Sequence, residues 1–543
     1  MLTAIILCRS KSSRFPNKHF FKVGKKSILE IIIDKLIDNK KINEIYIATG
    51  TKKNNLSYEK KLSKIKRFKN IKYYYSQNED NVTERINQVC KLINNNYSLI
   101  ISGDCCLIDN SLINRVYNSL KKNSKFDFIK CDKQLVHEGL KVFKTKAWDK
   151  LNFFSKKSIY QEHPGYFLNK KPNLFNITNF IPKKFEIGKK IRLSIDTQSD
   201  LNFLNLLFKI VNKKYKNFTI QNILKKNYLQ FKSVNSHVEQ KQVNKNYNKK
   251  INFITTVEKK YGLGHFMRCK TLYREVNETL SSNLSFFFVK RDSNKINLEG
   301  IRNYKLFSKS YINSFSNDEI FIVDLPTEEL SNVSAILNKF KKKVILIDNF
   351  SPNKINNVYL PIIKFNKKKN FDLIKTNNLI LKRDLLYEKL KKPKIIYDYL
   401  FVTSGSFFFN QSVLDFIKTL PKLKTLCILG PYCNQKDINL LKKLNIQYLI
   451  NPENISQLMC SSNRIFTRFG VTAFEIMSIG LKPIIIYHNE SIQRLKDIKN
   501  LENNNFLILF HKFIENKKMS TVIKKNIKLN FGAPKFINLL KRI

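Results

Sequence analysis

Cationic and hydroxyl side chains gather in the first 24 residues of the chain, MLTAIILCRSKSSRFPNKHFFKVG. The apolar run from Leu2 to Leu7 predicts a buried strand, and Pro16 favours a loop rather than a helix after it. The polar side chains of this loop are Arg9, Lys11, Ser12, Ser13, Arg14 and Lys18. A loop that leaves the first strand of an open α/β sheet lies where such sheets bind ligands. Its cations and backbone N–H groups suit a polyphosphate.

Two aspartates further along the chain carry the type of side chain that binds a hard cation. Segment 99–109, LIISGDCCLID, is an apolar strand that ends at Gly103-Asp104, and segment 192–201, RLSIDTQSDL, contains Asp196. Taken singly, such aspartates more often form turns or helix caps than bind ligands. A polyphosphate ligand brings negative charge, and Mg²⁺ held by one or two carboxylates can neutralise it.

Three sequence segments resemble the sugar cytidylyltransferases, especially the spore-coat-polysaccharide branch related to the CMP-sialic acid synthetases. The spacing R-x-x-S-x-R-x-P-x-K from Arg9 to Lys18 is similar to the family's nucleotide loop. GDCCLID resembles the family's GDCPLID, with Cys106 in place of proline, and RLSIDTQSDL resembles its RLTLDTPEDL. The chain departs from the family at Lys11, where a glycine is usual, and at Cys8, where a small residue is usual.

This resemblance implies a nucleotidyltransferase domain of the glycosyltransferase-A-like, Rossmann type. It assigns nucleotide binding to Arg9, Ser12, Arg14 and Lys18, with Arg9 and Lys18 also catalytic, and Mg²⁺ binding to Asp104 and Asp196. NEDNVTER adds Asp80 and Arg85 as nucleotide contacts, and YQEHPGYF adds Glu162 and His163 near the sugar. The matches occur in family order, which favours catalysis over separate turn-forming roles.

A second glycine loop begins the other half of the chain, in segment 251–272, INFITTVEKKYGLGHFMRCKTL. Its pattern predicts a strand, a tight turn at Gly262 and Gly264, and a helix with His265 and Arg268 on its first turn. GLGHFMRCKTL resembles the GxGHxMRCLTLA element of UDP-sugar hydrolases that make sugars for pseudaminic acid, which have a two-lobed glycosyltransferase-B fold. The resemblance implies that His265 is the general base that activates water. The helix N-terminus favours the neutral form of such a base; the alternative is a capping or packing histidine.

The remaining segments of this half match the same family less closely. FIVDLP and VILIDNF predict strands that end at Asp324 and Asp348. YDYLFVTSGSFFFNQ resembles a nucleotide loop of the family, with Gly405 retained and Ser404 as a departure. Segment 464–481, RIFTRFGVTAFEIMSIGL, resembles the helix whose N-terminus binds the nucleotide diphosphate. That resemblance assigns nucleotide binding to Gly470, Thr472 and Glu475, with Glu475 on the ribose, whereas Phe469 replaces an expected glycine.

A chain of 543 residues is too long for one hydrophobic core. We expect an α/β protein with a cytidylyltransferase domain at 1–228 and a linker at 229–250. A glycosyltransferase-B-like N-lobe would follow at 251–390 and a C-lobe at 391–543. Alternation of strand and helix patterns predicts parallel sheets with helices on both faces.

The formal net charge of +57 would suit a nucleic-acid-binding protein. The charge is spread along the chain, however, and no zinc-finger spacing or RNA-binding aromatic motif accompanies it, so nucleic acid is not an expected partner. The nine cysteines form no CxxC pair, and the N-terminus lacks a signal-peptide pattern, which favours the cytoplasm. The sequence has no apolar run long enough to span a membrane. The first family often forms homodimers.

The combined prediction is a bifunctional enzyme of nonulosonic acid (sialic, pseudaminic or legionaminic-like) or surface-polysaccharide biosynthesis. The first half would transfer CMP from CTP to a sugar acid, and the second would hydrolyse a UDP-sugar. The departures at Ser404 and Phe469 keep two alternatives open for the second half: a glycosyltransferase, or a sugar-nucleotide-binding domain without catalysis.

Overall fold

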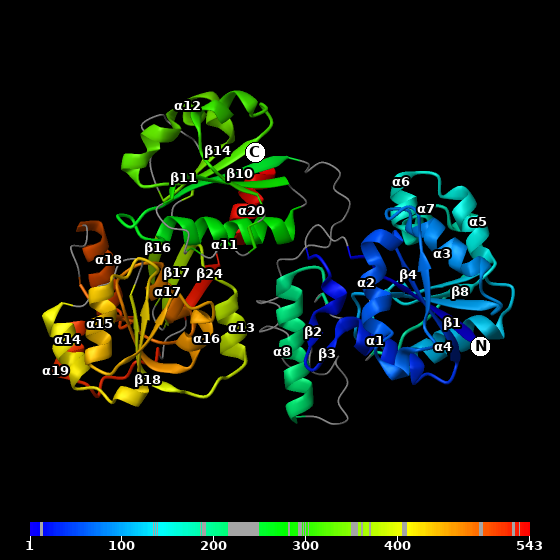
Figure 1. Ribbon diagram of the computed structural model, residues 1–543, viewed down its shortest axis with the longest axis horizontal. Helices are drawn as coiled ribbons and strands as arrows, with labels where there is room; N and C mark the ends of the chain where they lie inside the picture. The colour runs from blue at the N-terminus through cyan, green and yellow to red at the C-terminus, as the bar shows by residue number, and fades with distance from the viewer. Residues whose placement is uncertain are drawn as a thin grey trace. The chain divides into compact units, whose positions relative to one another are not determined.

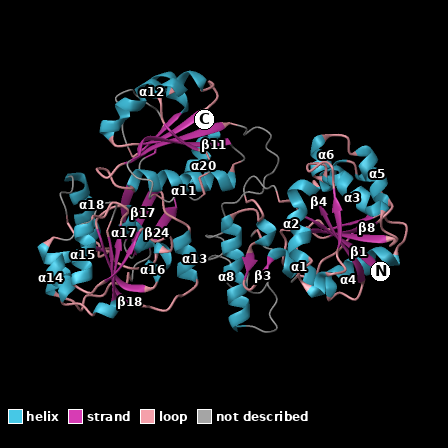
Figure 2. Cartoon of the chain, viewed as in Figure 1, coloured by secondary structure: helices cyan, strands magenta, loops and turns pink. Residues whose placement is uncertain are grey.

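The chain divides into two compact units, residues 1–236 and 237–543. The computed structural model describes all residues except 11–14, 134, 136, 138, 185, 187–191, 215–248, 281–282, 292–295, 297, 299, 302, 349–356, 360–361, 369–370, 404–409, 488–491, 524–526 and 532. Strands alternate with helices in both units (Figure 1, Figure 2), which confirms the α/β prediction. Most of the predicted linker lies outside the described residues.

The first unit is built on a seven-stranded sheet of order β5-β4-β1-β6-β8-β7-β9. Its strands are β1 (Leu2–Leu7), β4 (Ile42–Thr49), β5 (Lys72–Tyr75), β6 (Tyr97–Ser102), β7 (Phe128–Lys130), β8 (Lys141–Lys144) and β9 (Ile177–Asn179). Strand β1 pairs in parallel with β4 and β6. Strand β8 is antiparallel to both β6 and β7, so the prediction of a purely parallel sheet is wrong here. No helix lies between β7 and β8 among the residues that the structure describes there, and parallel strands need a crossover connection.

Helices cover both faces of this sheet (Figure 1). On one face α1 (Ile28–Ile37) lies beside α4 (Asn110–Lys122), and the Asn110 side chain donates to the Lys35 carbonyl. On the other face α3 (Val82–Lys91) and α5 (Ala147–Phe154) pack on the core around Ile5 and Trp148. The unit also contains α2 (Lys52–Leu62), α6 (Ser158–Glu162), α7 (Pro164–Lys170), α8 (Gln198–Lys214) and the hairpin β2 (Lys22–Val23) and β3 (Lys26–Ser27).

The second unit contains two six-stranded sheets whose neighbouring strands are all parallel, as predicted. The first has the order β12-β11-β10-β13-β14-β15, with β10 (Lys250–Val257), β11 (Asn283–Arg291), β12 (Tyr304–Leu306), β13 (Ile320–Asp324), β14 (Val344–Ile347) and β15 (Val358–Tyr359). The second has the order β20-β19-β18-β21-β22-β23, with β18 (Tyr397–Val402), β19 (Thr425–Leu429), β20 (Gln447–Ile450), β21 (Ser462–Thr467), β22 (Ile484–Ile485) and β23 (Ile508–Leu509). A smaller sheet joins β16 (Ile362–Lys368), β17 (Phe371–Leu379) and β24 (Ile527–Phe531).

The helix nearest the C-terminus, α20 (Ala533–Arg542), packs against the first of these sheets. Its Phe536 and Leu540 side chains are buried in the same core as Phe253 and Phe286, which come from β10 and β11. The other helices are α11 (Gly264–Thr279), α12 (Ser334–Lys339), α13 (Asp384–Leu390), α14 (Gln411–Lys418), α15 (Gln435–Lys443), α16 (Ile455–Cys460), α17 (Val471–Ser478), α18 (Ile492–Asn503) and α19 (Phe510–Glu515).

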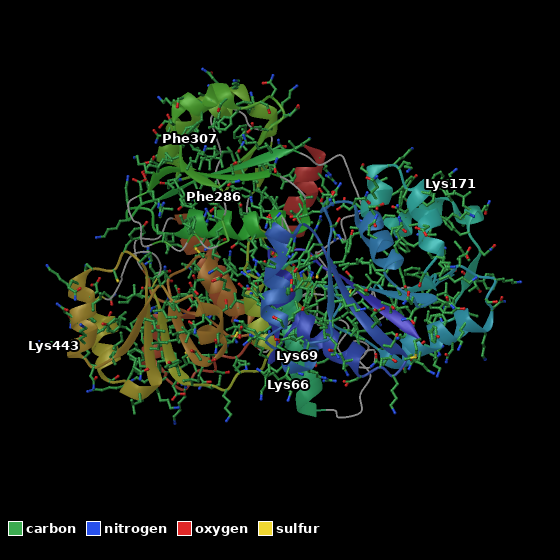
Figure 3. All side chains as sticks on the ribbon, turned by 45° about the vertical axis from the view of Figure 1, so that its right-hand side comes forward. Lys66, Lys69, Lys171, Phe286, Phe307 and Lys443 are labelled. Carbon is green, nitrogen blue, oxygen red and sulfur yellow. The ribbon has the colours of Figure 1, made fainter. Side chains whose placement is uncertain are left out.

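Many lysines of the chain lie at its surface, whereas the aromatic strands are buried. Figure 3 labels Lys66, Lys69, Lys171 and Lys443, all of which are exposed, and Phe286, which is fully buried. Among the helices in the described part of the chain, none has the length and apolar character needed to cross a membrane.

Candidate active site

Lys18 joins the two aspartates that the sequence predicts as metal ligands. Its Nζ atom lies 2.5 Å from Oδ2 of Asp104 and 2.6 Å from Oδ1 of Asp196. Lys18 lies in a 3₁₀ turn (Lys18–Phe20) of the first loop, Asp104 follows β6, and Asp196 precedes α8. Three predicted residues, far apart in sequence, therefore meet at one point at the carboxyl end of the central strands, where open α/β sheets bind ligands.

Both carboxylates of this cluster are fixed by further contacts. The Ser102 hydroxyl donates to Oδ1 of Asp104 at 2.6 Å. Burial would raise the pKa of Asp104, but the Lys18 charge and the hydrogen bonds from Lys18 and Ser102 bring it below its ordinary value. Arg192 forms an ion pair with Asp196, whose backbone N–H donates to Asp200 at 2.9 Å. Two oriented carboxylates can accept a hard cation.

Gly103 brings the end of β6 against the start of the predicted nucleotide loop. Its N–H donates to the Leu7 carbonyl at 2.8 Å, and an added Cβ would lie 2.7 Å from that same oxygen. Beneath the loop, the His19 ring is hydrogen bonded to the Tyr58 hydroxyl at 2.8 Å. Burial and the neighbouring Lys18 charge lower the pKa of His19 to about 3, so the His19 ring is neutral at neutral pH.

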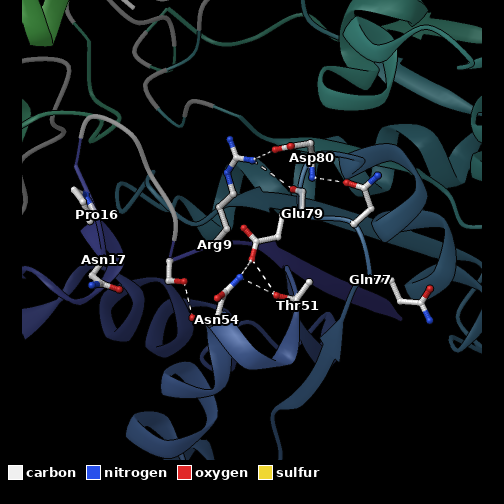
Figure 4. A pocket seen from close by; sticks show the side chains of 10 residues that line it. Arg9, Pro16, Asn17, Thr51, Asn54, Gln77, Glu79 and Asp80 are labelled. Carbon is white, nitrogen blue, oxygen red and sulfur yellow. Dashed lines mark hydrogen bonds and ion pairs between the residues drawn. The ribbon is translucent and has the colours of Figure 1, made fainter. Parts of the chain in front are cut away.

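Arg9 connects the loop to two other predicted segments. One of its terminal nitrogens lies 2.8 Å from Asp80 (Figure 4). The other lies 3.8 Å from Glu162. Arg85, in contrast, is almost fully buried and donates to the Glu79 carbonyl at 2.5 Å. The buried Arg85 side chain therefore fixes the Glu79-Asp80 turn through the Glu79 carbonyl. His163 is exposed, between α6 and α7, and Ser12 and Arg14 lie outside the described residues.

A polar cleft of about 1090 Å³ opens beside Arg9 and Asp80. Its lining is Arg9, Ser10, Pro16, Asn17, Thr51, Asn54, Gln77, Asn78, Glu79 and Asp80 (Figure 4). Oε1 of Glu79 accepts hydrogen bonds from Thr51 at 3.2 Å and Asn54 at 2.8 Å. The sequence interpretation missed these three residues, although the polar run after the β4 strand pattern was a signal, because strand ends of α/β sheets line ligand sites.

In the second unit, His265 and Arg268 lie on the first turn of α11, as predicted, and both contact Asp324 at the end of β13. The His265 Nδ1 atom lies 2.6 Å from Oδ1 of Asp324. Arg268 donates to both oxygens of the same carboxylate at 2.7 and 2.8 Å, and it lies 3.3 Å from Asp348. Asp324 and Asp348, the two acids predicted at strand ends, thus both contact Arg268 on the helix.

Electrostatics keep the Asp324 carboxylate charged although its side chain is completely buried. Burial would raise the pKa of Asp324, but the charge and hydrogen bonds of Arg268 and the hydrogen bond of His265 bring it below its ordinary value. A charged Asp324 favours the tautomer in which Nδ1 of His265 carries the proton. Nε2 is then free to accept a proton, which is the arrangement of a general base oriented by a carboxylate.

The glycine turn before this helix has the predicted shape. Gly262 has a φ of 71°, in the left-handed region, where glycine is favoured. Gly264 is the first residue of α11. In the region that the structure describes, no hydrogen bond or ion pair joins the His265 group to Gly470, Thr472 or Glu475.

The second predicted nucleotide element is only partly suited to a ligand. Gly470 and Thr472 lie at the start of α17, with open space around Gly470. Glu475 is buried on the same helix, and burial raises the pKa of its carboxyl. Phe469, which replaces the expected glycine, is buried against Phe474. Gly405 and Ser404 lie outside the described residues.

The sequence predicts Asp104 and Asp196 as the ligands of a metal ion. Among the described residues, no group of three or more His, Cys, Asp or Glu side chains is placed to hold a metal ion. The two carboxylates nevertheless lie close enough together to contact one ammonium group. They therefore fit Mg²⁺, which commonly takes only one or two carboxylates from the protein and completes its coordination shell with water and phosphate oxygens.

Comparison with known proteins places the first unit in a family. Residues 3–251 match the model of the cytidylyltransferase family. The uncharacterised protein MJ1063 of Methanocaldococcus jannaschii is 29% identical over 248 residues, covering 44% of this chain and 96% of that protein. MJ1062 of the same organism is 27% identical over 278 residues, covering 44% of this chain and 56% of that protein.

Two solved structures each align with about two fifths of the chain. A cytidylyltransferase from Leptospira borgpetersenii is 20% identical, with a TM-score of 0.36, over 42% of this chain and 95% of that one. A CMP:2-keto-3-deoxy-manno-octonic acid synthetase complexed with CTP is 13% identical, with a TM-score of 0.32, over 38% of this chain and 98% of that one. From the family match, the N-terminal part of the chain, which contains the Lys18, Asp104 and Asp196 cluster, is a cytidylyltransferase family domain.

Proposed function

We propose that the first unit transfers CMP from CTP to a hydroxyl of a sugar acid and releases pyrophosphate. The observation that carries this proposal is the meeting of Lys18, Asp104 and Asp196 at one strand end in a cytidylyltransferase family domain. The sugar hydroxyl attacks the α-phosphorus of CTP. A new phosphorus–oxygen bond forms as the bond to the pyrophosphate breaks.

The charges of the site are suited to this reaction. Arg9 and Lys18 neutralise the phosphates, and we expect Ser12 and Arg14 to add contacts to them. Asp104 and Asp196 are the residues to hold Mg²⁺, which when bound neutralises charge on the departing pyrophosphate. The polar cleft of about 1090 Å³ has the size of a nucleotide site. Arg85 keeps the Asp80 turn in place through the Glu79 carbonyl.

Pyrophosphate release from the purified chain tests this proposal. CTP, UTP, GTP and ATP are each supplied with Mg²⁺ and a panel of sugar acids, and Asp104→Asn is the matched variant. Release that requires CTP, a sugar acid and Asp104 would support the proposal. Equal release with every nucleotide, or full activity of Asp104→Asn, would contradict it.

A second function is proposed for the second unit because His265 is paired with a buried carboxylate. We infer that it hydrolyses a UDP-sugar, with Nε2 of His265 taking a proton from the water that attacks the anomeric carbon while UDP leaves. The two parallel six-stranded sheets, and the return of α20 to the first of them, are compatible with a glycosyltransferase-B-like pair of lobes. Both proposed activities would serve biosynthesis of a nonulosonic acid or a surface polysaccharide.

The burial of Phe469 also favours a specific alternative, a sugar-nucleotide-binding unit without hydrolysis. UDP release from a panel of UDP-sugars by the full chain, compared with His265→Asn, separates these functions. Release without an added acceptor that is lost in the variant supports a hydrolase. Release that needs an added acceptor indicates a glycosyltransferase, and binding of UDP-sugar without release indicates a binding unit.

A further inference from the structure

The ammonium group of Lys18 lies between the two carboxylates that are proposed to hold a metal ion. Its Nζ atom is 2.5 Å from Oδ2 of Asp104 and 2.6 Å from Oδ1 of Asp196. Lys18 is buried. Its ion pairs are therefore difficult to break, since removal of the lysine charge alone would leave two carboxylates without compensation.

The other oxygen of each carboxylate has a partner of its own. Oδ1 of Asp104 accepts a hydrogen bond from the Ser102 hydroxyl at 2.6 Å. Oδ2 of Asp196 is paired with Arg192, which is itself buried. The two oxygens that contact Lys18 are therefore the ones that face a shared cation. A divalent metal ion that bridges the two aspartates has to take these same two atoms.

Lys18 and a metal ion cannot hold those two oxygens at the same time. Mg²⁺ binds carboxylate oxygens at about 2.0–2.1 Å, which is closer than Nζ lies to either of them. Two cations that share both oxygens would repel each other at short range, in a site where solvent screens them only weakly. The ammonium group must therefore leave before a metal ion binds.

The phosphates of a nucleotide can reach Lys18 from the polar cleft. Pro16 and Asn17, the two residues before Lys18, line this cleft together with Arg9. A triphosphate carries more negative charge than two carboxylates, and an ammonium group forms strong charge-assisted hydrogen bonds with phosphate oxygens. These bonds offset the loss of the two aspartates as partners.

We propose that Lys18 excludes a divalent cation from Asp104 and Asp196 until the phosphates of a nucleotide draw its ammonium group away. The inference rests on the proposed function, because the metal ligands and the phosphate contact are those of that reaction. It adds an order of binding, in which the nucleotide comes first and the metal ion second. Ser102 and Arg192 keep the carboxylates oriented when Lys18 leaves.

Binding of Mn²⁺ alone to the full-length chain, after treatment with a chelator, tests this order by titration calorimetry. We expect Lys18→Met to bind Mn²⁺ about tenfold to hundredfold more tightly than the wild type, because a group that fills the site about 90–99% of the time lowers the apparent affinity by that factor. Lys22→Met is the matched control, at an exposed position of β2, and should bind Mn²⁺ like the wild type. CTP in EDTA should bind the wild type and bind Lys18→Met more weakly.

Thermal unfolding gives a second readout that does not depend on activity. Mg²⁺ without nucleotide should raise the midpoint of Lys18→Met more than that of the wild type, because a ligand that binds only the folded state stabilises it. If Lys18→Met does not fold, Lys18→Gln replaces it, since the amide still donates hydrogen bonds but carries no charge. Addition of Asp104→Asn to either variant should remove the gain in Mn²⁺ affinity.

The outcomes separate this inference from the proposed reaction. Equal Mn²⁺ affinity of the wild type and the Lys18 variants would overturn the inference, even where CTP-dependent pyrophosphate release stands. Failure of CTP to bind the wild type in EDTA, or a gain in affinity that persists in the Asp104→Asn background, would overturn it as well. Tighter Mn²⁺ binding by the variants, without pyrophosphate release by the wild type from any sugar acid, would retain the inference and overturn the reaction.

Discussion

The Nδ1 atom of His265 and the Oδ1 atom of Asp324 lie 2.6 Å apart, although 59 residues separate them in the sequence. The contact joins the first turn of α11 to the end of β13. Because β13 pairs directly with β10, the strand that leads into the glycine turn, the sheet fixes this distance. The pair is therefore part of the fold itself.

Replacement of Asp324 by Asn should reduce hydrolysis of the UDP-sugar about 10²- to 10⁴-fold, because the amide no longer favours the tautomer with a free Nε2. The measurement is the rate of UDP release. Asp318→Asn is the control, since Asp318 is exposed and paired only with Lys343 among the described residues. A rate for Asp324→Asn within a factor of two of the control would exclude an orienting role.

Replacement of Lys18 by Met should lower CTP-dependent pyrophosphate release about 10²- to 10³-fold, because one preorganised charge is lost from the phosphate site. It should also lower the free energy of unfolding by about 3–5 kcal/mol, since Asp104 loses its partner. Urea denaturation measures the second effect. Lys22→Met, at an exposed position of β2, should change neither quantity.

The contribution of Asp104 to stability should depend on pH in a defined direction. Its pKa is lower in the folded chain than in the unfolded chain, where it is about 3.9. The contribution is therefore complete above about pH 4 and is lost as the pH falls toward the folded value. The difference in unfolding free energy between wild type and Asp104→Asn should shrink when urea denaturation is repeated between about pH 5 and pH 3. A difference that grows as the pH falls would show the opposite shift.

Replacement of Gly103 by Ala should destabilise the first unit by about 1–3 kcal/mol, because the new methyl group would lie 2.7 Å from the Leu7 carbonyl oxygen. The displaced strand end should also lower pyrophosphate release, since Asp104 is the next residue. Thermal unfolding and kinetics measure the two effects. Gly264→Ala in the second unit, where nothing lies within 4 Å of an added Cβ, should leave pyrophosphate release unchanged.

The sequence allowed the main strand ends to be predicted, because a buried strand followed by an acid or a basic loop has a recognisable pattern. The family resemblance singled out Lys18, Asp104 and Asp196 one by one. It did not reveal that β8 runs antiparallel, since side-chain periodicity identifies a strand but not its direction. Lys18 was predicted as a phosphate contact, and only the tertiary structure shows it between two carboxylates.

Residues that act through a distant partner were the ones that sequence reasoning missed. Thr51 and Asn54 line the cleft through bonds to Glu79, and no local pattern links these positions. Arg192 begins the same segment as Asp196, yet its ion pair with that aspartate depends on how the segment turns. The predicted roles of Ser12, Arg14 and Gly405 stay predictions, as do the domain boundaries at 228, 250 and 390.

The packing of α20 has a consequence for the order in which the second unit is made. The core around Phe253 on β10 is completed by Phe536 and Leu540, which a ribosome adds nearly three hundred residues later. The apolar face of that first sheet therefore stays incompletely covered while the second sheet is synthesised. During that interval it is a natural binding surface for a chaperone.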